Sequence, residues 1–510
     1  MAYNGASRVL DQNWTGASTV PSRALYPHQW SWDSGFIAIG LRHLSPFRAQ
    51  RELETLLAAQ WDDGRIPHIV FNPAVPLTAY FPSPDFWRSS TAGAAAGAPG
   101  SVETSGIVQP PIHALAAWLV HRADPAASRR RGFLRRVYPR LVAWQRYLTE
   151  RRDFGGRGLA SIVHPWESGM DNSPCWDAPL SRVDPAATGS FRRADLTHAC
   201  HADRPTDLDY GRYVRLAENY RDHGYLDDDG VPRPFAVEDP GVNALLIASE
   251  HALAEIAVEL GTDPADHLVR AEAGTTALLK RLWQPDAGMF LCHDVLTGEA
   301  IEERSGAGLI PLIVPGLPED VVAALLRTAT GPHFGLGGPA RLVPSYDLRG
   351  HAFDPSRYWR GPAWFNVNWL VERGLRCHRQ HHTADALRAA FCAAAAESGF
   401  AEYVDPCSGE ARGSRDFGWT AALTVDLLRS REAPWSETVR EPAASALAGP
   451  AGGAARAPGP GATPPTVQGT ARDAAPGAAQ GAAQGTTTET GIERMSVAPD
   501  GAPTGERETR

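Results

Sequence analysis

Apolar residues recur at intervals of three and four positions along most of residues 5–430, and this spacing predicts amphipathic helices. Proline and glycine mark several of the predicted helix ends. Ser45-Pro46 and Asp239-Pro240 are typical helix starts, and Gly261 and Gly399 are typical stops. The helices predicted from this pattern cover residues 5–13, 34–43, 46–61, 106–122, 132–151, 211–224, 240–260, 264–283, 318–329, 362–374, 384–398 and 416–430.

Strand patterns are few and short. The clearest covers residues 288–294 and is followed by a turn at 296–298, which predicts a hairpin at the end of a helix. Many helices joined by long loops are typical of an (α/α)6 barrel, in which inner and outer helices alternate around a closed ring. A helical solenoid is the alternative, but no repeat period is visible. We therefore predict an all-α (α/α)6 barrel with a loop-built pocket and lid at one end and a few short hairpins.

The composition divides the chain into two parts. All 15 tryptophans lie between Trp14 and Trp435, and no Phe, Tyr or Trp follows Trp435. Residues 436–510 consist mostly of Ala, Gly, Pro and Thr, which cannot bury enough apolar surface to offset the entropy of ordering. We predict a catalytic barrel domain over residues 1–435 and a disordered, low-complexity tail over residues 436–510.

The charge balance limits the partners of this chain. A net charge of −9 argues against nucleic acid or an acidic membrane surface. The dense basic run Arg129-Arg130-Arg131 is expected to be a solvated helix face. The N-terminus shows no charged-then-apolar leader pattern, and no apolar run is long enough for a membrane span. We expect a cytoplasmic protein that binds a small molecule, and the sequence leaves open whether it forms a homo-oligomer.

Cysteine and histidine residues give little support for a disulfide framework or a metal site. The six cysteines are far apart and form no CxxC pair. The stretches His198-Ala199-Cys200-His201 and Cys377 to His382 hold metal-ligand residue types at short spacing, but neither has a matching second pair of ligands. We expect neither a metal ion nor another cofactor.

The segment 164–177 concentrates the side chains that carry chemistry. It holds the acids Glu167, Asp171 and Asp177 beside Trp166 and Trp176, and its Gly and Pro residues prevent a regular helix. Indoles stack on sugar faces and lower the local dielectric, while carboxylates bind hydroxyls or transfer protons. A turn-rich loop with its indoles in the core and its acids capping helices is the structural alternative. The combination favours a carbohydrate site.

A second segment near the N-terminus offers groups for the same purpose. Trp30 and Trp32 are followed by Asp33, so that an indole face and a carboxylate are available to a sugar. The structural alternative is that Asp33 caps a helix that begins at Ser34.

A second acid, far from Asp171 in the sequence, completes a candidate pair. Glu402 follows the helix stop at Gly399, so it stands at a helix end. A hydrolase with two carboxylates uses one to protonate the leaving oxygen and the other to activate water or attack directly. On this reasoning Glu410 is a rival of Glu402.

Polar groups in the long loops extend the candidate site. Arg204 lies just before a predicted helix, and an arginine in a sugar pocket suggests a substrate carboxylate. Gln109 is placed to reach a hydroxyl or carboxylate, or to cap a loop. Within the loop 62–104, the aromatic part is expected to wall the pocket and residues 89–100 to move as a lid. The loops expected to build the site are 62–104, 153–209 and 331–360.

Four blocks of this sequence resemble one known family. They are Tyr-Pro-His-Gln-Trp-Ser-Trp-Asp-Ser from Tyr26, His-Pro-Trp-Glu-Ser-Gly-Met-Asp-Asn-Ser-Pro from His164, Arg-Tyr-Trp-Arg-Gly-Pro-Ala-Trp from Arg357, and Glu-Tyr-Val-Asp-Pro from Glu402 with Phe-Gly-Trp-Thr-Ala-Ala-Leu after it. They are similar to blocks of the bacterial mannosylglycerate and glucosylglycerate hydrolases, which resemble glycoside hydrolase family 63 and, more distantly, the trehalases. The resemblance covers residues 7–431. It implies an (α/α)6 barrel that hydrolyses an α-glycosidic bond with inversion and without metal, releasing a sugar and glycerate.

The resemblance also assigns roles to single residues. It places the general acid on Asp171 and the general base on Glu402, which stands seventeen residues before Trp419 as in the related enzymes and is therefore preferred to Glu410. The sugar-binding residues would be Tyr26, Trp30, Trp32, Asp33, Trp359 and Trp364, with Trp419 lining the pocket. From the segment 164–177 we add Trp166 as a substrate-binding residue. The glycerate-binding residues would be Tyr80, Gln109, Arg204, Tyr210 and Tyr358.

Some features leave the substrate open. Cys175 and Arg65 depart from what the resemblance leads us to expect, and the choice between glucose and mannose is undecided. We expect Asp171 to be kept protonated by its apolar surroundings and by the neighbouring charge of Glu167. The alternatives are a hydrolase of another α-glucoside, an isomerase or epimerase that would favour paired histidines, and a sugar-binding module that would need no carboxylate pair.

Overall fold

The computed structural model describes residues 2–197, 201–228 and 230–435, and the predicted tail and the stretch His198 to Cys200 lie outside them. Every helix predicted from the apolar pattern is present, with small shifts at most ends. Ser45 and Asp239 cap their helices as predicted, each accepting a backbone N–H. The long helices are α1 (Ala2–Gln12), α2 (Ser31–Leu41), α3 (Pro46–Ala58), α6 (His113–Ala123), α8 (Phe133–Arg151), α10 (Asp207–Asp222), α11 (Pro240–Leu260), α12 (Ala265–Leu282), α13 (Glu319–Thr330), α14 (Phe365–Cys377), α15 (His381–Glu397) and α16 (Gly418–Arg429).

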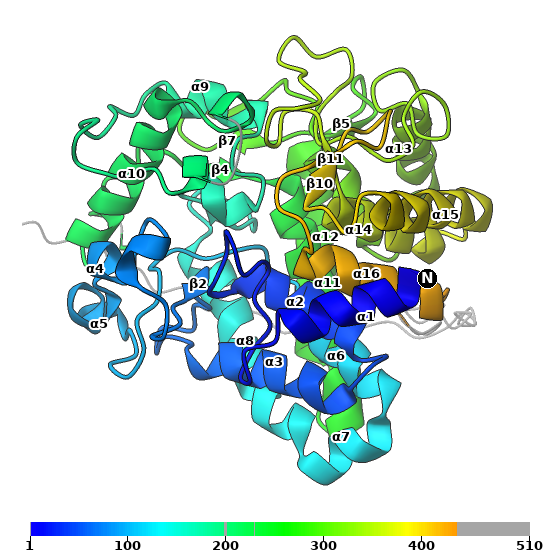
Figure 1. Cartoon of the computed structure of the whole chain (residues 1–510). Coiled ribbons are helices and arrows are strands. Elements are labelled where there is room, and N and C mark those ends of the chain that lie inside the picture. Colours follow the sequence, from blue (N-terminus) through cyan, green and yellow to red (C-terminus); the bar gives the residue numbers. More distant parts are fainter. Residues whose placement is uncertain (1, 198–200, 229, 436–510) are drawn as a thin grey trace, which may run out of the picture. The chain divides into compact units, whose positions relative to one another are not determined.

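The inner elements of the body pack against one another in a closed ring. Helix α2 packs against α6, α6 against α11, α11 against the 3-10 helix η7 (Gly306–Ile313), η7 against α14, α14 against α16, and α16 back against α2. Outside this ring, α3 covers α2, α8 covers α6 and α11, α12 covers α11, α13 covers η7, α15 covers α14, and α1 covers α16. The blue α1 and α2 lie beside the orange α16 in Figure 1. The arrangement is of the (α/α)6-barrel type.

The membership of the ring differs from the prediction at two places. Helix α10 was predicted among the helices of the barrel. It packs instead against the short helix α5 (Ser89–Ala92) and is neither an inner nor an outer helix of the ring. The missing inner member, η7, was not predicted. Its residues Gly-Ala-Gly-Leu-Ile-Pro-Leu-Ile are all buried, so they show no apolar stripe of helical period, and Pro311 interrupts regular helix bonding. The predicted start of α6 at residue 106 was also too early by seven residues.

Inner and outer helices differ in how their sequences are buried. All residues of α2 and most of α11 are buried, whereas α8 buries one face. Among the described helices, α11 is long and apolar enough to cross a membrane by length and composition, but 83% of its most apolar window is buried in the body. The position of α11 in the inner ring, covered by α12 and α8, therefore accounts for its apolar composition. The arginines 129–131 lie on the short helix α7 (Pro125–Arg131), largely at the surface as predicted.

Short strands join segments that are far apart in the sequence. The strand β1 (Gln29–Trp30) precedes α2 and pairs with β2 (Ile69–Val70), and β9 (Ala363–Trp364) precedes α14 and pairs with β10 (Tyr403–Val404), which also pairs with β11 (Ala411–Arg412). These pairs therefore lie at the N-terminal ends of inner helices. The predicted hairpin is present, because β7 (His293–Asp294) pairs with β8 (Glu299–Ala300) across the predicted turn. The predicted strand 288–294 is divided in two, and its first part, β6 (Met289–Phe290), pairs with β5 (Trp283–Gln284) at the end of α12. The remaining pairings join β3 (Ser161–Ile162) to β4 (Val237–Glu238) and β4 to β7.

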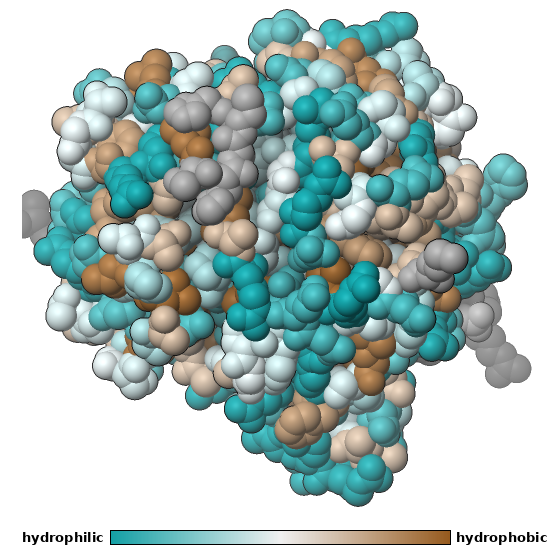
Figure 2. Space-filling view, viewed as in Figure 1, coloured by the Kyte–Doolittle hydropathy of each residue, from teal (hydrophilic) through white to brown (hydrophobic). Residues whose placement is uncertain are grey.

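The surface of the body carries only scattered apolar side chains. Brown residues in Figure 2 are separated by teal and white ones over most of the face shown. Large apolar side chains that are half exposed, such as Phe47, Leu77 and Val269, come from different helices and loops. The apolar residues of the chain are thus used mainly inside the ring.

Close contact between α2 and α16 gives a test of the ring. A Cβ atom added to Gly40 would lie 2.2 Å from the carbonyl oxygen of Ala422, which belongs to backbone and cannot move aside. We expect Gly40→Ala to lower the free energy of unfolding by about 2–3 kcal/mol in chemical denaturation. Gly100→Ala is the matched control, since no atom lies within 4 Å of its added Cβ, and its effect should stay within about 0.5 kcal/mol. Equal effects of both changes would contradict the close packing.

Candidate active site

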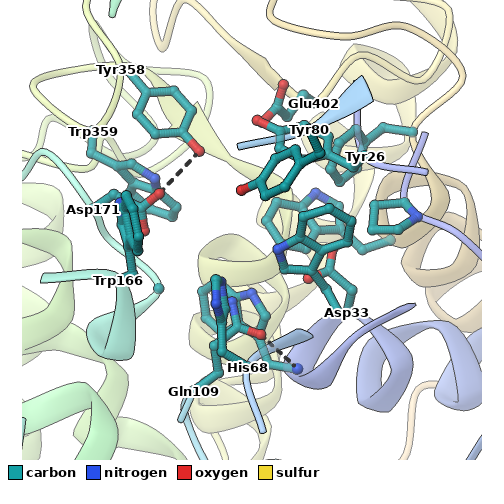
Figure 3. A pocket seen from close by; sticks show the side chains of 16 residues that line it. Tyr26, Asp33, His68, Tyr80, Gln109, Trp166, Asp171, Tyr358, Trp359 and Glu402 are labelled. Carbon is teal, nitrogen blue, oxygen red and sulfur yellow. Dashed lines mark hydrogen bonds between the residues drawn. The ribbon is translucent and has the colours of Figure 1, made fainter. Parts of the chain in front are cut away.

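A cavity opens where the strands meet the N-terminal ends of the inner helices. The space within it, including its opening to solvent, is about 460 Å³. Figure 3 shows Asp171, Trp166 and Tyr358 on one side of it, and Glu402, Tyr26 and Asp33 on the other. Its lining residues are Pro21, Tyr26, Trp30, Trp32, Asp33, His68, Tyr80, Gln109, Trp166, Gly169, Asp171, Tyr358, Trp359, Glu402, Phe417 and Trp419.

Most residues that the sequence nominated line this one cavity, but Trp364 does not. Trp364 stacks on Trp359 with 3.7 Å between ring centroids and an interplanar angle of 1°, so it stands behind Trp359. Trp359 has a φ of +60°, in the left-handed region that bulky residues rarely adopt. Such strained backbone persists only where its surroundings hold it. The role of Trp364 here is to hold the indole that faces the cavity.

Arg204 and Tyr210 also lie behind the wall of the cavity. The Nη1 of Arg204 is 3.4 Å from the hydroxyl oxygen of Tyr26, and its guanidinium lies 4.5 Å from the ring centroid of Tyr358. Its Nε and Nη2 are buried with no hydrogen-bond partner among the described residues. Tyr210 donates its hydroxyl to the carbonyl of Phe81 at 3.1 Å. A buried positive charge therefore stands directly behind two tyrosines of the site.

Four lining residues were not nominated from the sequence: Pro21, His68, Gly169 and Phe417. Burial, with a contribution from His164, lowers the pKa of His68 to about 3, so this imidazole is neutral. Gly169 has a φ of +71°, and a Cβ there would lie 2.4 Å from the indole of Trp32. The glycine inside the Glu-Ser-Gly-Met-Asp block was a usable signal, since only a residue without a side chain fits this contact.

The loop that carries Asp171 is held by its own polar groups. Pro165–Ser168 forms a 3-10 turn in which the N–H of Trp166 is capped by the Nδ1 of His164 at 3.1 Å. The backbone carbonyl of Asp171 accepts the hydroxyl of Tyr213 at 3.0 Å, and its Oδ2 lies 3.5 Å from the hydroxyl of Tyr358. The acid is thus fixed from both its backbone and its side chain.

The protonation of Asp171 is set by burial and two charges. Burial raises its pKa, Arg204 opposes the rise and Glu402 adds to it, so that the pKa reaches about 7. The prediction that Glu167 supplies the raising charge was wrong. Glu167 is wholly buried and forms a two-point ion pair with Arg152 at 2.8 and 2.9 Å, so its charge is compensated.

Glu402 stands on the opposite wall with two partners of its own. It follows α15, after Phe400 with a φ of +55°, and precedes β10. Its Oε1 accepts the hydroxyl of Tyr26 at 3.0 Å and its Oε2 accepts the N–H of Ser414 at 3.0 Å. Burial raises its pKa, while Arg204 and these donors oppose the rise. Glu410 pairs with Arg412 at the surface and does not line the cavity, so the geometry favours Glu402.

Asp33 is the third carboxyl group of the cavity. The helix α2 begins at Ser31 rather than Ser34, so Asp33 lies inside the first turn instead of capping it, and it faces the cavity. Burial and the nearby Glu402 and Asp171 raise its pKa well above the ordinary value. The Oε1 of Gln109 accepts the N–H of Trp32 at 3.1 Å, which fixes this turn (Figure 3). Three carboxyl groups that share one enclosed space cannot all be charged together, which provides an acid and a base in the same site.

The predictions about the loop 62–104 are tested by the residues that line the cavity. Tyr80 walls the cavity as expected, but none of residues 89–100 lines it. They form short helical turns that pack against Trp61. The packing is close, since a Cβ built on Gly93 would lie 2.6 Å from the ring of Trp61. Within the described ranges, no group of three or more His, Cys, Asp or Glu side chains is placed to hold a metal ion.

Comparisons with known proteins show which proteins this chain is similar to. A family model described as "Mannosylglycerate hydrolase MGH1-like glycoside hydrolase domain" matches residues 26–420. A mannosylglycerate hydrolase of Rubrobacter radiotolerans is 41% identical over 429 residues, which are 83% of this chain and 96% of that protein. A glucosylglycerate hydrolase of Mycolicibacterium hassiacum is 38% identical over 437 residues, again 83% and 96%. The crystal structure of a mannosylglycerate hydrolase of Thermus thermophilus in complex with Tris and D-glycerate matches with a TM-score of 0.76 and 39% identity, over 84% of this chain and 100% of that one.

The raised pKa of Asp171 predicts how its replacement changes stability with pH. The folded-state pKa of about 7 lies above the ordinary value of 3.8, so the contribution of Asp171 to stability is present below pH 4 and is lost as the pH rises through 7. Asp171→Asn, which is never charged, should therefore stabilise the protein at pH 8 by on the order of 2 kcal/mol more than at pH 5. Denaturant unfolding at both pH values measures this difference. Identical changes at pH 5 and pH 8 would contradict the assignment.

Proposed function

The chain belongs to the mannosylglycerate hydrolase MGH1-like glycoside hydrolase family and is a glycoside hydrolase, and we propose that it cleaves the α-glycosidic bond between a hexose and glycerate with inversion of the anomeric carbon. The observation that carries the proposal is the pair Asp171 and Glu402, which face one cavity from opposite walls with a buried arginine behind them. We propose residues 1–435 as the catalytic domain and 436–510 as a tail without chemistry of its own.

In the proposed reaction, Asp171 is the general acid. Its pKa of about 7 keeps a large fraction protonated at neutral pH, so it is able to donate a proton to the glycosidic oxygen as the bond to the sugar breaks. Glycerate then leaves as an alcohol. Burial also raises the pKa of Glu402 on the opposite wall, while Arg204, the N–H of Ser414 and the hydroxyl of Tyr26 oppose the rise by stabilising its carboxylate form.

Glu402 acts as the general base in this proposal. It takes a proton from a water molecule, whose oxygen attacks the anomeric carbon from the face opposite the leaving group. An inverting pair needs room for that water, and we expect the two carboxyl groups to be about 6.5–9.5 Å apart with substrate bound. Asp33 and the indoles of Trp30, Trp32 and Trp419 would hold the sugar, since they line the same cavity.

The part of the cavity wall formed by Tyr26 and Tyr358 suits a negatively charged aglycone. Arg204 is buried with two N–H groups that have no partner among the described residues, beside Tyr26 and Tyr358, and its field reaches the cavity through these tyrosines. We propose that Tyr80, Gln109 and Tyr358 contact glycerate directly. Arg204 supplies the compensating charge, and Tyr210 supports the wall through its packing on Trp166.

Proton NMR of the reaction tests both the substrate and the stereochemistry. Incubation with glucosylglycerate and, separately, with mannosylglycerate should first release the β-anomer of the free sugar, and the faster substrate identifies the preferred hexose. Asp171→Asn and Glu402→Gln should each lower kcat by about 10²–10⁴-fold while leaving the fold intact. A Glu402→Gln enzyme that keeps most of its activity would remove the base assignment. An epimerised product would replace hydrolysis by isomerase chemistry.

The role of Arg204 predicts a substrate-dependent loss. Arg204→Ala should lower kcat/KM for a glycerate glycoside by about 10²-fold, because a carboxylate loses its buried partner, and should change kcat/KM for a neutral aryl α-glycoside of the same sugar far less. Arg412→Ala is the control, since Arg412 pairs with the exposed Glu410 outside the cavity. Equal losses on both substrates would argue against a carboxylate-bearing aglycone.

A further inference from the structure

A buried ion pair beside the site has no part in the proton transfers described above. We propose that Arg152 and Glu167 are positioning residues, which fix the loop that carries the general acid Asp171 and the segment that carries Gln109. The inference rests on the proposed function, since it concerns the geometry of that acid.

Glu167 joins segments that belong to different parts of the cavity wall. Its Oε1 accepts the N–H of Val108 at 3.2 Å, and its Oε2 accepts the N–H of Val163 at 2.8 Å. Val108 precedes Gln109, which lines the cavity and holds the first turn of α2. Glu167 itself follows Trp166 and precedes Asp171 by four residues. One carboxylate thus sets the distance between two segments of the site.

Arg152 anchors this carboxylate to the outer helix α8. It lies directly after that helix, its side chain is wholly buried, and its two Nη atoms donate to the two oxygens of Glu167. Its Nε donates to the hydroxyl of Tyr147, which lies in α8, at 2.7 Å. A two-point bond between planar groups fixes orientation as well as distance.

A wider charge cluster holds Arg152 in turn. Asp227 lies 3.3 Å from the Nε of Arg152 and 3.5 Å from Arg65, and accepts the hydroxyls of Tyr147 and Tyr220 at 2.7 and 2.9 Å. Burial alone would raise the pKa of Asp227, but Arg152, Arg65 and the two tyrosines lower it below the ordinary value, so it stays charged. The same Arg65 that departs from the expected family pattern donates to the carbonyl of Gly106 at 2.8 Å, two residues before Val108.

Helix α10 links the cluster to the acid by a second route. Tyr220 in α10 hydrogen-bonds to Asp227, and Tyr213, two turns earlier in the same helix, donates to the backbone carbonyl of Asp171. The loop of Asp171 is therefore held from Glu167 on one side and from α10 on the other. Both routes end in the same group of buried charges.

Stability alone does not account for such a cluster. Buried ion pairs are expensive to desolvate, and well-packed apolar residues often stabilise a protein as well or better. The advantage of a buried ion pair is that it fixes the orientation of its two groups, because apolar contacts tolerate small shifts that a two-point ion pair does not. A shift of about 1 Å in a catalytic group is enough to lower a rate by about 10²-fold.

The test compares two substrates of one enzyme sample. The first is the glycerate glycoside, whose alkoxide leaving group requires a proton from Asp171. The second is the α-glycosyl fluoride of the same sugar, in which the C–F bond breaks to release fluoride ion with little need for that proton, while Glu402 still activates the attacking water. The ratio of kcat/KM on the two substrates is independent of the fraction of folded protein. It therefore reports what the glycoside needs and the fluoride does not, namely the acid Asp171 and the glycerate contact of Gln109, and not the stability.

Glu167→Gln keeps the size of the side chain but removes the charge and one acceptor atom. We expect it to lower kcat/KM on the glycerate glycoside by at least about tenfold more than on the fluoride. Arg152→Lys keeps the positive charge and loses the two-point geometry, so it should change the ratio in the same direction. It replaces Glu167→Gln in the test if that variant does not fold. An unchanged ratio in the folded variant would overturn the inference.

Two further variants separate the possible causes. Glu372→Gln is the matched control, because Glu372 is wholly buried and paired with Arg376 at 2.7 Å but does not line the cavity, and its ratio should equal that of the wild type. Asp171→Asn tests the proposed function itself and should show the largest change in the ratio. If Asp171→Asn loses both activities equally, the acid assignment fails. If it discriminates and Glu167→Gln does not, only the positioning inference fails.

Discussion

The site depends on the closure of the helical ring, and that closure depends on the contact of α2 with α16. The two helices come from opposite ends of the body's sequence, yet Gly40 lets the backbone at Ala422 approach so closely that no side chain fits between them. Asp33 stands in the first turn of α2, and Trp419 stands in the first turn of α16. Because Glu402 also precedes α16, the contact brings both ends of the body to the Asp171 loop, which comes from the middle of the chain.

In the closed ring, the surroundings of each carboxyl group set its tendency to be protonated. Asp171, Glu402 and Asp33 are all carboxyl groups facing one enclosed space, and burial raises the pKa of each. Their hydrogen-bond partners differ, because Glu402 accepts from Tyr26 and from the N–H of Ser414, while the carboxyl group of Asp171 has its own backbone N–H and a long contact to Tyr358. Arg204 behind the wall limits how far the values of Asp171 and Glu402 rise. The proposed proton donor and proton acceptor are thus the same chemical group in different surroundings.

Much of this architecture could be predicted, and the misses have physical causes. The helices α8 and α11 were predicted nearly to the residue, because their apolar positions and flanking glycine or capping residues agree. Asp171 and Glu402 were assigned through the resemblance to the hydrolase family, and both line the cavity, while their catalytic roles stay a prediction. The helix η7 was missed since a fully buried element needs no polar face. The charge of Glu167 was predicted to act on Asp171, because its pairing with Arg152 arises only in the tertiary fold. Trp364 was placed in the cavity because the positive φ of Trp359 could not be foreseen.

Gly169 gives the cavity a fixed dimension. The indole of Trp32 rests against the bare backbone of this glycine, two residues before Asp171, at a distance that leaves no room for a side chain. The absence of a side chain at Gly169 therefore sets the separation between Trp32, which we propose to hold the sugar, and the loop of the proposed acid Asp171. A single methyl group at that position would push Trp32 and this loop apart, even with every polar residue of the site left in place.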